Sequence, residues 1–190
     1  ASPSAGIISE DFDPIQKAKD YEAFGAAALS ILTEEDFFLG SIEYLKEVKA
    51  ITSLPILRKD FMIDEYQIYE AKLMGADCIL LIASILSDSQ ITAFVTLAEE
   101  LELDYLIEVH DEAELGRVEH FQEAMIGVNN RDLKTFTVDL DNSVRLKHKF
   151  MHSNIFIAES GIKNQDDIDY LKSHHIHAFL IGESLMKNSF

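Results

Sequence analysis

The sequence predicts an α/β protein of the (β/α)8 TIM-barrel class, with strands 2 to 8 of that barrel present in the chain. Short apolar runs alternate with amphipathic stretches along the whole chain. The runs are apolar on both faces, which is typical of parallel strands that are covered by helices. Successive runs lie about 25 residues apart, so eight such units would give the roughly 200 to 250 residues of a small barrel.

Seven apolar runs predict the strands, and they occupy residues 26–32, 54–57, 77–83, 104–109, 124–128, 154–158 and 177–182. The stretches between them have apolar residues at helical spacing and predict helices at residues 15–24, 42–51, 66–74, 89–101, 112–121, 140–150 and 166–173. The first predicted helix follows a loop without a strand before it. We therefore expect strand 1 to lie upstream of Ala1, and residues 1–190 to be one barrel domain that is incomplete at both ends.

Composition and charge narrow the classes of function. The chain has 190 residues, of which 47% are hydrophobic, enough for one globular domain with a sizeable core. Its formal net charge of −18 argues against binding to nucleic acid, whose phosphates it would repel. The single cysteine, Cys78, excludes an internal disulfide and favours a reducing cytoplasm. No apolar run has the length of a membrane span, so we expect no membrane partner.

Charged side chains stand at the carboxyl ends of the predicted strands, where the active sites of this fold class lie. Lys59 follows the run 54–57, and Glu108 lies in the run 104–109. A partly desolvated lysine and a nearby carboxylate can serve as general acid and general base in carbonyl chemistry. The alternative is that the two residues form only a salt bridge, and their positions in the sequence do not decide between these interpretations.

Two glycine-containing turns follow the last two predicted strands. Ser160-Gly161 and Gly182-Glu183 stand where this architecture often binds phosphate through backbone N–H groups. Glycine permits the close backbone approach that such a site needs. A sugar phosphate is the predicted ligand class, and a pair of tight turns without a ligand is the alternative.

The histidines give no metal site. His174, His175 and His177 lie in the loop that enters the last predicted strand, on the face opposite the predicted active site. His110 follows Glu108, but one histidine without a second ligand nearby is more often a hydrogen-bonded loop residue. We therefore assign His110 no role from the sequence and predict no metal.

A series of longer motifs runs through nearly the whole chain. It consists of SPS, TEEDFFLGS, LPILRKDFMID, YQIYEA, GADCILLI, LIEVHDEAEL, IGVNNRDLKTF, AESGI and FLIGESLM. The piece ESGI is common among barrel enzymes, but RKDF, EVHDEAEL and NNRDLKTF in this order and spacing are specific. Together these motifs resemble the indole-3-glycerol-phosphate synthase family of the tryptophan pathway.

The resemblance implies a cytoplasmic carboxy-lyase that works without metal or organic cofactor. Such an enzyme closes an indole ring on the sugar phosphate 1-(2-carboxyphenylamino)-1-deoxyribulose 5-phosphate, with loss of carbon dioxide and water. The resemblance also leaves room for fusion to, or association with, another tryptophan-pathway enzyme.

The motif match implies roles for individual residues. Lys59 would be the general acid that protonates the ketone oxygen as the ring carbon attacks, and Glu108 would be the base in the later dehydration. Asn129 and Arg131 would order the polar groups of the substrate and the catalytic carboxylate. The other implied substrate-binding residues are Ser2 on the first loop, Phe38 and Leu80 in the aromatic pocket, Glu159, and, around the phosphate, Ser160, Gly161, Gly182 and Glu183.

Two other hypotheses stand beside the synthase. The family carries a glutamate and a lysine just before SPS, and both are missing from this chain, which favours a non-catalytic barrel fragment that needs a partner segment. The other alternative is a related phosphate-binding barrel such as phosphoribosylanthranilate isomerase, which would use a cysteine and an aspartate. Cys78 counts against the isomerase because it lies inside a predicted strand and not at its end.

Overall fold

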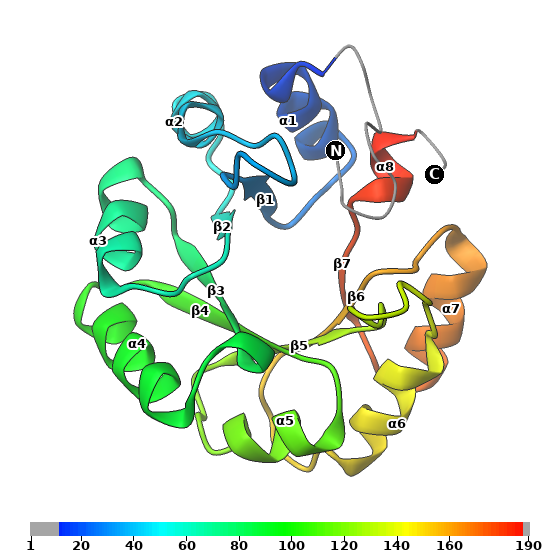
Figure 1. Ribbon diagram of the computed structural model, residues 1–190. Coiled ribbons are helices and arrows are strands. Elements are labelled where there is room, and N and C mark those ends of the chain that lie inside the picture. The colour runs from blue at the N-terminus through cyan, green and yellow to red at the C-terminus, as the bar shows by residue number, and fades with distance from the viewer. Residues whose placement is uncertain (1–11, 188–190) are drawn as a thin grey trace. The chain divides into compact units, whose positions relative to one another are not determined.

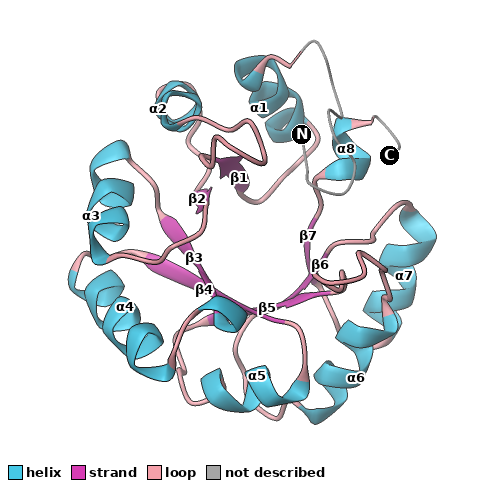
Figure 2. Ribbon diagram, in the orientation of Figure 1, coloured by secondary structure: helices cyan, strands magenta, loops and turns pink. Residues whose placement is uncertain are grey.

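Parallel strands alternate with helices along the chain, as the sequence predicts (Figures 1 and 2). The computed structural model describes residues 12–187. Its strands are β1 (Leu29–Leu32), β2 (Ile56–Lys59), β3 (Cys78–Ile82), β4 (Asp104–Val109), β5 (Met125–Asn129), β6 (Phe156–Glu159) and β7 (Ala178–Leu180). Its α-helices are α1 (Pro14–Ala23), α2 (Ile42–Lys49), α3 (Glu65–Met74), α4 (Asp88–Glu100), α5 (Glu112–Val118), α6 (Asp141–Lys149), α7 (Gln165–Ser173) and α8 (Glu183–Met186), and a short 3-10 helix, η1, spans Ala83–Ile85.

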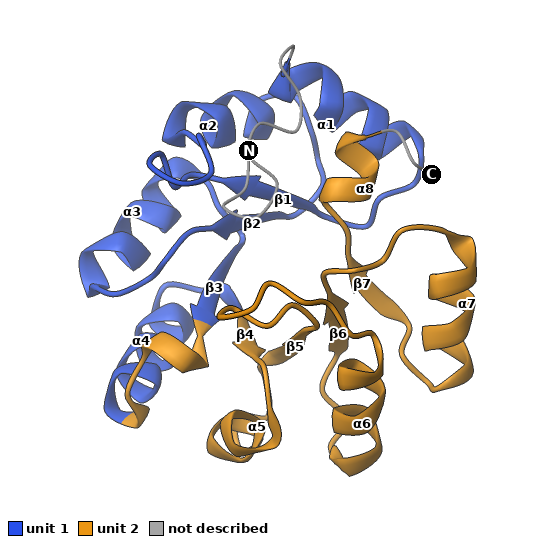
Figure 3. Cartoon of the chain, turned by 45° about the vertical axis from the view of Figure 1, so that its right-hand side comes forward, with its two compact units in different colours: residues 1–81, 89–105 blue, residues 82–88, 106–190 orange. Residues whose placement is uncertain are grey.

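The chain divides into two compact units (Figure 3). The first comprises residues 1–81 and 89–105, and the second comprises residues 82–88 and 106–190. The strands run in sequence order, β1-β2-β3 in the first unit and β4-β5-β6-β7 in the second, and the pairs within each unit are parallel. This order and alternation confirm the predicted (β/α)8 TIM-barrel class, because a parallel pair needs a crossover connection, here a helix.

The first predicted strand is shorter in the structure than in the sequence prediction. Gly25 adopts a left-handed conformation with φ of 86°, and the N–H of Ala26 donates to the carbonyl of Tyr21. These features close the end of α1, so residues 26–28 belong to a turn and β1 begins at Leu29. Apolar character alone does not distinguish a strand from the turn that leads into it.

Helix α3 shows how the local sequence fixes the elements of the first unit. Asp64 caps the helix by accepting from the N–H of Tyr66, and the Gln67 side chain accepts from the N–H of Asp64, which completes a capping box. Gly75, with φ of 95°, ends the helix. The buried face of α3 carries Ile68, and the five residues of β3 beneath the helices are all buried.

The charges at the end of β2 have different roles in the first unit. Arg58 is only 2% exposed, and its Nη2 lies 2.7 Å from Glu70 Oε1 and 3.3 Å from Asp60 Oδ2. Its Nε donates to Thr33 Oγ1, and its Nη1 donates to the carbonyl of Gln67. A buried guanidinium needs such partners to offset its loss of solvation. Arg58 and Asp60 therefore join β1, β2 and α3, and Lys59 is left out of this network.

Paired polar groups also hold the second unit together. Arg117 on α5 donates to the carbonyls of Ala83 and Leu86, and Asn154 donates to the carbonyls of Phe121 and Ala124. These bonds satisfy backbone groups in the loops at the ends of strands. Across residues 12–187, none of the helices combines the length and the apolar character that crossing a membrane would require.

Candidate active site

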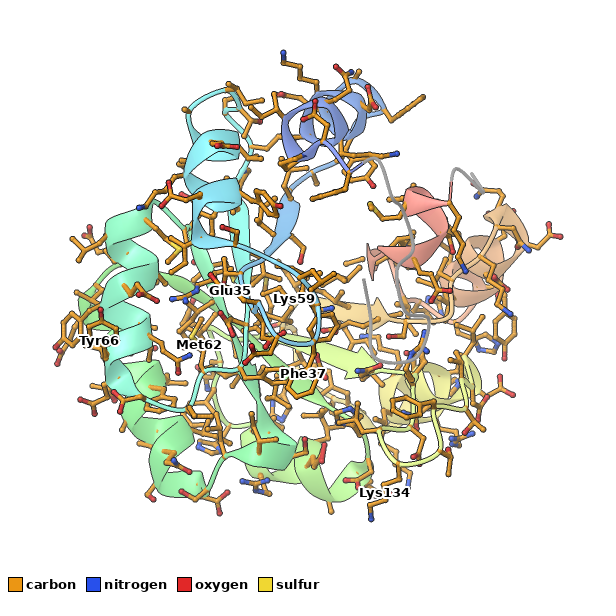
Figure 4. The ribbon with its side chains drawn as sticks, turned by 45° about the horizontal axis from the view of Figure 1, so that its top comes forward. Glu35, Phe37, Lys59, Met62, Tyr66 and Lys134 are labelled. Atoms are coloured by element: carbon orange, nitrogen blue, oxygen red, sulfur yellow. The ribbon has the colours of Figure 1, made fainter. Side chains whose placement is uncertain are left out.

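Lys59 is the last residue of β2 and is labelled in Figure 4, as are Glu35 and Phe37 of the loop after β1. The carbonyl of Lys59 accepts from the N–H of Thr33, which fixes its backbone to the end of β1. The side chain is half-buried, and within residues 12–187 its ammonium group has neither a hydrogen bond nor an ion pair. An ammonium held in place without a fixed partner is free to bind an oxygen of a ligand.

The loop after β1 is folded by one carboxylate. Glu34 accepts from the N–H groups of Asp36, Phe37 and Phe38, so three backbone donors converge on a single side chain. Phe38 is half-buried, and its ring centroid lies 6.2 Å from that of Phe61, which follows β2. These two rings form an aromatic pair beside the end of β2.

Two other predicted substrate-binding residues, Leu80 and Ser2, belong to the first unit. Leu80 lies in the middle of β3, whose five residues are all buried, and is 2% exposed. Ser2 lies outside the described residues.

The register of the second unit places three polar side chains on one face of its sheet. Glu108 on β4 is paired with Gly127 on β5, and Asn129, two residues further along β5, is paired with Glu159 on β6. Side chains alternate between the two faces of a strand, so Glu108, Asn129 and Glu159 point to the same side. Glu108 is 4% exposed, and Asn129 Nδ2 donates to its Oε1 at 3.0 Å. A buried carboxylate is thus held in one orientation.

Gly127 leaves the space that the carboxylate of Glu159 occupies. A Cβ at this position would lie 2.0 Å from Glu159 Oε1, closer than atoms approach in folded proteins, and 3.0 Å from Leu106 Cδ1, which is a tight contact. Glu159 is only 2% exposed, so its side chain has little room to move aside. The absence of a side chain at position 127 is therefore a requirement for the position of Glu159.

Replacing Gly127 by alanine should lower the free energy of unfolding by about 1–3 kcal/mol, the usual cost of overpacking a core. The matched control is Gly116→Ala on α5, where a Cβ would meet nothing within 4 Å and where alanine favours the helix by about 1 kcal/mol. Urea unfolding of both variants measures the difference. Equal stability of Gly127→Ala and the wild-type protein would show that Glu159 can occupy another position.

Arg131 connects the end of β5 to the start of α8. Its N–H donates to Asn129 Oδ1, and its Nη2 lies 3.2 Å from Glu183 Oε2. The hydrogen bond from Lys187 and the charges of Lys187 and Arg131 outweigh the effect of burial and lower the pKa of Glu183 below its ordinary value. The carboxylate next to Gly182 is therefore paired with cations and presents little free negative charge to a ligand.

The turn after β6 has an unusual backbone. Ser160 and Gly161 both lie in the left-handed region, with φ of 67° and 82°. Asn130 Nδ2 donates to the carbonyl of Ser160, and Asn130 Oδ1 accepts from the N–H and the hydroxyl of Ser143. A non-glycine residue with positive φ persists only where its surroundings hold it, and such strain is concentrated at functional sites. This turn therefore has a fixed shape.

Four residues of this site have no role in the sequence prediction, although His110 was considered there: His110, Glu114, Asn130 and Asn142. Glu114 Oε2 accepts from the N–H of His110 at 2.6 Å and lies 3.3 Å from His110 Nδ1, and Asn142 Nδ2 donates to the carbonyl of His110. The one signal in the sequence is the spacing of Asp111 and Glu114, since Asp111 caps α5 by accepting from the N–H of Glu114, the third residue of the helix.

The imidazole of His110 lies among acidic groups. Burial alone would lower its pKa, but the hydrogen bond with Glu114 and the charges of Glu108, Glu114 and Asp111 together raise the pKa of His110 above its ordinary value. The pKa of the partner carboxyl, Glu114, shifts in the opposite direction. Burial would raise the pKa of Glu114, yet its bonds with His110 and the charge of Arg117 lower it. Both pKa shifts have the direction that pairing of a protonated imidazole with an ionised carboxylate produces.

No cluster of three or more histidine, cysteine, aspartate or glutamate side chains suited to a metal ion occurs among residues 12–187. The polar groups described above can donate, accept and carry protons, which are the functions that acid and base chemistry requires.

Parallel strands in sequence order, with charged groups at their carboxyl ends, define a (β/α)8-barrel enzyme. A family model described as indole-3-glycerol phosphate synthase matches residues 1–189. The chain is 51% identical to an indole-3-glycerol phosphate synthase of Lachnoclostridium phytofermentans, with 100% of the chain and 70% of the relative covered. It is also 51% identical to one of Ruminiclostridium cellulolyticum, covering 99% and 72%. The chain belongs to the indole-3-glycerol phosphate synthase family, as its motifs predict.

A solved structure shares the fold. The N-acetylmannosamine-6-phosphate 2-epimerase from Clostridium perfringens superimposes with a TM-score of 0.70 at 14% sequence identity, over 91% of this chain and 79% of the epimerase. At this identity the likeness supports the fold class alone.

Proposed function

We propose that this chain supplies the acid, the base and the phosphate-binding turns of an indole-3-glycerol phosphate synthase. The reaction converts 1-(2-carboxyphenylamino)-1-deoxyribulose 5-phosphate into indole-3-glycerol phosphate, carbon dioxide and water. The observation that carries the proposal is the buried carboxylate of Glu108, which Asn129 holds on the same face of the sheet as Glu159. The match of the family model to residues 1–189 supports treating the chain as one catalytic domain.

In this proposal, Lys59 is the general acid of the ring closure. A bond forms between the ring carbon of the substrate and its ketone carbon, and Lys59 gives a proton to the ketone oxygen as the charge on that oxygen develops. The carboxylate of the anthranilate then leaves as carbon dioxide. The half-buried ammonium group of Lys59, without a fixed partner among residues 12–187, is suited to this role.

Glu108 is proposed as the base of the dehydration that follows. It takes the proton that is lost from the carbon next to the ring nitrogen. A carbon–carbon double bond forms there, and the hydroxyl made from the ketone oxygen receives a second proton from solvent and leaves as water, which completes the indole ring. Asn129 keeps the accepting oxygen in position through its 3.0 Å hydrogen bond, and Arg131 orders the substrate beside it. Phe38 and Leu80 are proposed to line the aromatic pocket, and Ser2 and Glu159 to contact the substrate.

The phosphate is proposed to bind the backbone N–H groups of the two turns after β6 and β7, which contain Ser160, Gly161, Gly182 and Glu183. Backbone donors suit a dianion because they point at it without moving. We also propose a cytoplasmic enzyme that can be fused to, or associate with, another enzyme of tryptophan synthesis.

The first experiment is turnover of the carboxyphenylamino-deoxyribulose phosphate, followed by the fluorescence of the indole product. Formation of indole-3-glycerol phosphate with release of carbon dioxide is the expected result. No turnover by the purified, folded chain would favour the barrel fragment, and turnover of phosphoribosylanthranilate instead would favour the isomerase.

Gly161→Ala tests the phosphate turn. A Cβ at Gly161 would lie 2.2 Å from Val138 Cγ1, so the turn must shift, and we expect KM and the inhibition constant of inorganic phosphate to rise about tenfold. Gly25→Ala is the control, since it carries similar left-handed strain, at φ of 86°, with nothing within 4 Å of the new Cβ. It should lower stability without changing phosphate affinity. If both variants bind phosphate as the wild-type protein does, this turn is not the phosphate site.

A further inference from the structure

We propose that His110 is a positioning residue for Glu108: clamped by Glu114, its imidazole holds the Glu108 carboxylate in the orientation that the base needs. This inference deepens the proposed function and rests on the role of Glu108 given there. It concerns residues of the second unit only.

The clamp holds His110 through one contact with its ring and two with its backbone. Glu114 Oε2 accepts from the backbone N–H of His110 at 2.6 Å and faces Nδ1 at 3.3 Å. Asn142 Nδ2 donates to the carbonyl of the same residue at 2.8 Å. The side chain of His110 is 15% exposed and that of Glu114 is 14% exposed, so neither moves freely in solvent. The direction of the remaining ring nitrogen is therefore set by α5 and α6.

That remaining nitrogen, Nε2, faces the predicted base. It lies 3.5 Å from Glu108 Oε1, the same oxygen that accepts from Asn129 Nδ2. The distance is that of an ion pair, and Nε2 is shielded from solvent without a hydrogen bond to any described residue. A buried donor without a hydrogen bond lowers the stability of the fold. A shift of a few tenths of an ångström would bring Nε2 and Glu108 Oε1 to hydrogen-bond distance.

The charge of the ring follows from what surrounds it. Ionised carboxylates can only accept hydrogen bonds, so Glu114 requires a proton on Nδ1 and Glu108 favours one on Nε2. An imidazole with both protons is a cation. The charged groups that face it are Glu108 on β4 and Asp111 and Glu114 at the start of α5, all of them acidic. The proposal therefore takes His110 as the cation that faces Glu108 at 3.5 Å.

This arrangement would serve the reaction in a specific way. Asn129 and His110 approach one oxygen of Glu108, which leaves Oε2 as the oxygen for the proton of the substrate. The two donors therefore decide which oxygen reacts. His110 itself does not touch the substrate, so it acts only through Glu108.

The test is a double-mutant cycle. His110→Gln should lower kcat by about 10- to 100-fold, the worth of a hydrogen bond to a charged group, and should change KM less than about twofold. In the Glu108→Gln background, the same substitution should have almost no further effect on kcat. The matched control is His148→Gln, an exposed histidine on α6, which should leave kcat unchanged. If the loss of kcat in the double variant equalled the product of the losses in the two single variants, the proposal would be overturned, because His110 would then act independently of Glu108.

A second measurement does not depend on activity. NMR titration of the imidazole should place the pKa of His110 above the ordinary value of a histidine, and both Glu108→Gln and Glu114→Gln should lower it. If Glu108→Gln left the pKa of His110 unchanged, the proposed coupling between the two residues would be overturned. If the wild-type protein shows no turnover, the proposed function fails, and this titration alone decides whether His110 is coupled to Glu108.

Discussion

Glu108→Gln is expected to lower kcat by about 10²- to 10⁴-fold, the usual contribution of a positioned general base. Glutamine has nearly the same size and can still accept from Asn129 Nδ2, so the fold should be kept while the ability to take up a proton is lost. KM should change little, because the proton is transferred in the transition state and not in the bound substrate.

Indole fluorescence at saturating substrate measures this effect. Glu112→Gln is the matched control, since Glu112 stands on α5 close to Glu108 in the sequence but has a side chain that is 66% exposed. It should retain wild-type kcat and lose less than about 1 kcal/mol of stability with its surface ion pair. A Glu108→Gln variant with normal kcat would assign the base to another residue.

Lys59→Met should reduce kcat by a similar factor, about 10²- to 10⁴-fold, because it removes the proposed proton donor and keeps the length of the side chain. The stability of the protein should change little. Lys59 takes no part in the network of Arg58, and no described group loses a partner when its ammonium is removed. Equal urea midpoints with unequal kcat would therefore separate catalysis from folding.

Lys134→Met is the control for Lys59. Lys134 lies on the loop after β5, is exposed, and is labelled in Figure 4. It should show normal turnover and normal stability. The assignment of Lys59 as the acid would be wrong if Lys59→Met and Lys134→Met had the same kcat.

The alternation of strands and helices was predictable because it depends on local pattern. Buried parallel strands have to be apolar on both faces, and the helices that cover them have to be apolar on one. These requirements can be recognised in short segments of the sequence, so β1 to β7 of the described residues lie where the apolar runs predict strands. The family was predictable for a different reason, since motifs such as NNRDLKTF preserve residue types in a fixed order.

The boundary of β1 and the division of roles at the end of β2 were not predictable. The sequence RKD shows three charges in a row, and nothing in it distinguishes the buried Arg58 from the half-buried Lys59. The difference arises because alternate residues of a strand face opposite sides, and Glu70 on α3 happens to face the side of Arg58.

Patterns and motifs in the sequence are enough to assign the fold class, the family and the residue types at the strand ends. Three contacts became visible only in the folded chain: Gly127 makes room for Glu159, Asn129 holds Glu108, and His110 faces the same carboxylate. The first two contacts join residues on neighbouring strands, so their distances depend on strand register. The third joins residues two apart in the chain, and its distance depends on α5 and α6, which hold His110. The residue types at a strand end therefore indicate which chemistry is available there. The positions of those side chains depend on neighbours from other strands and helices.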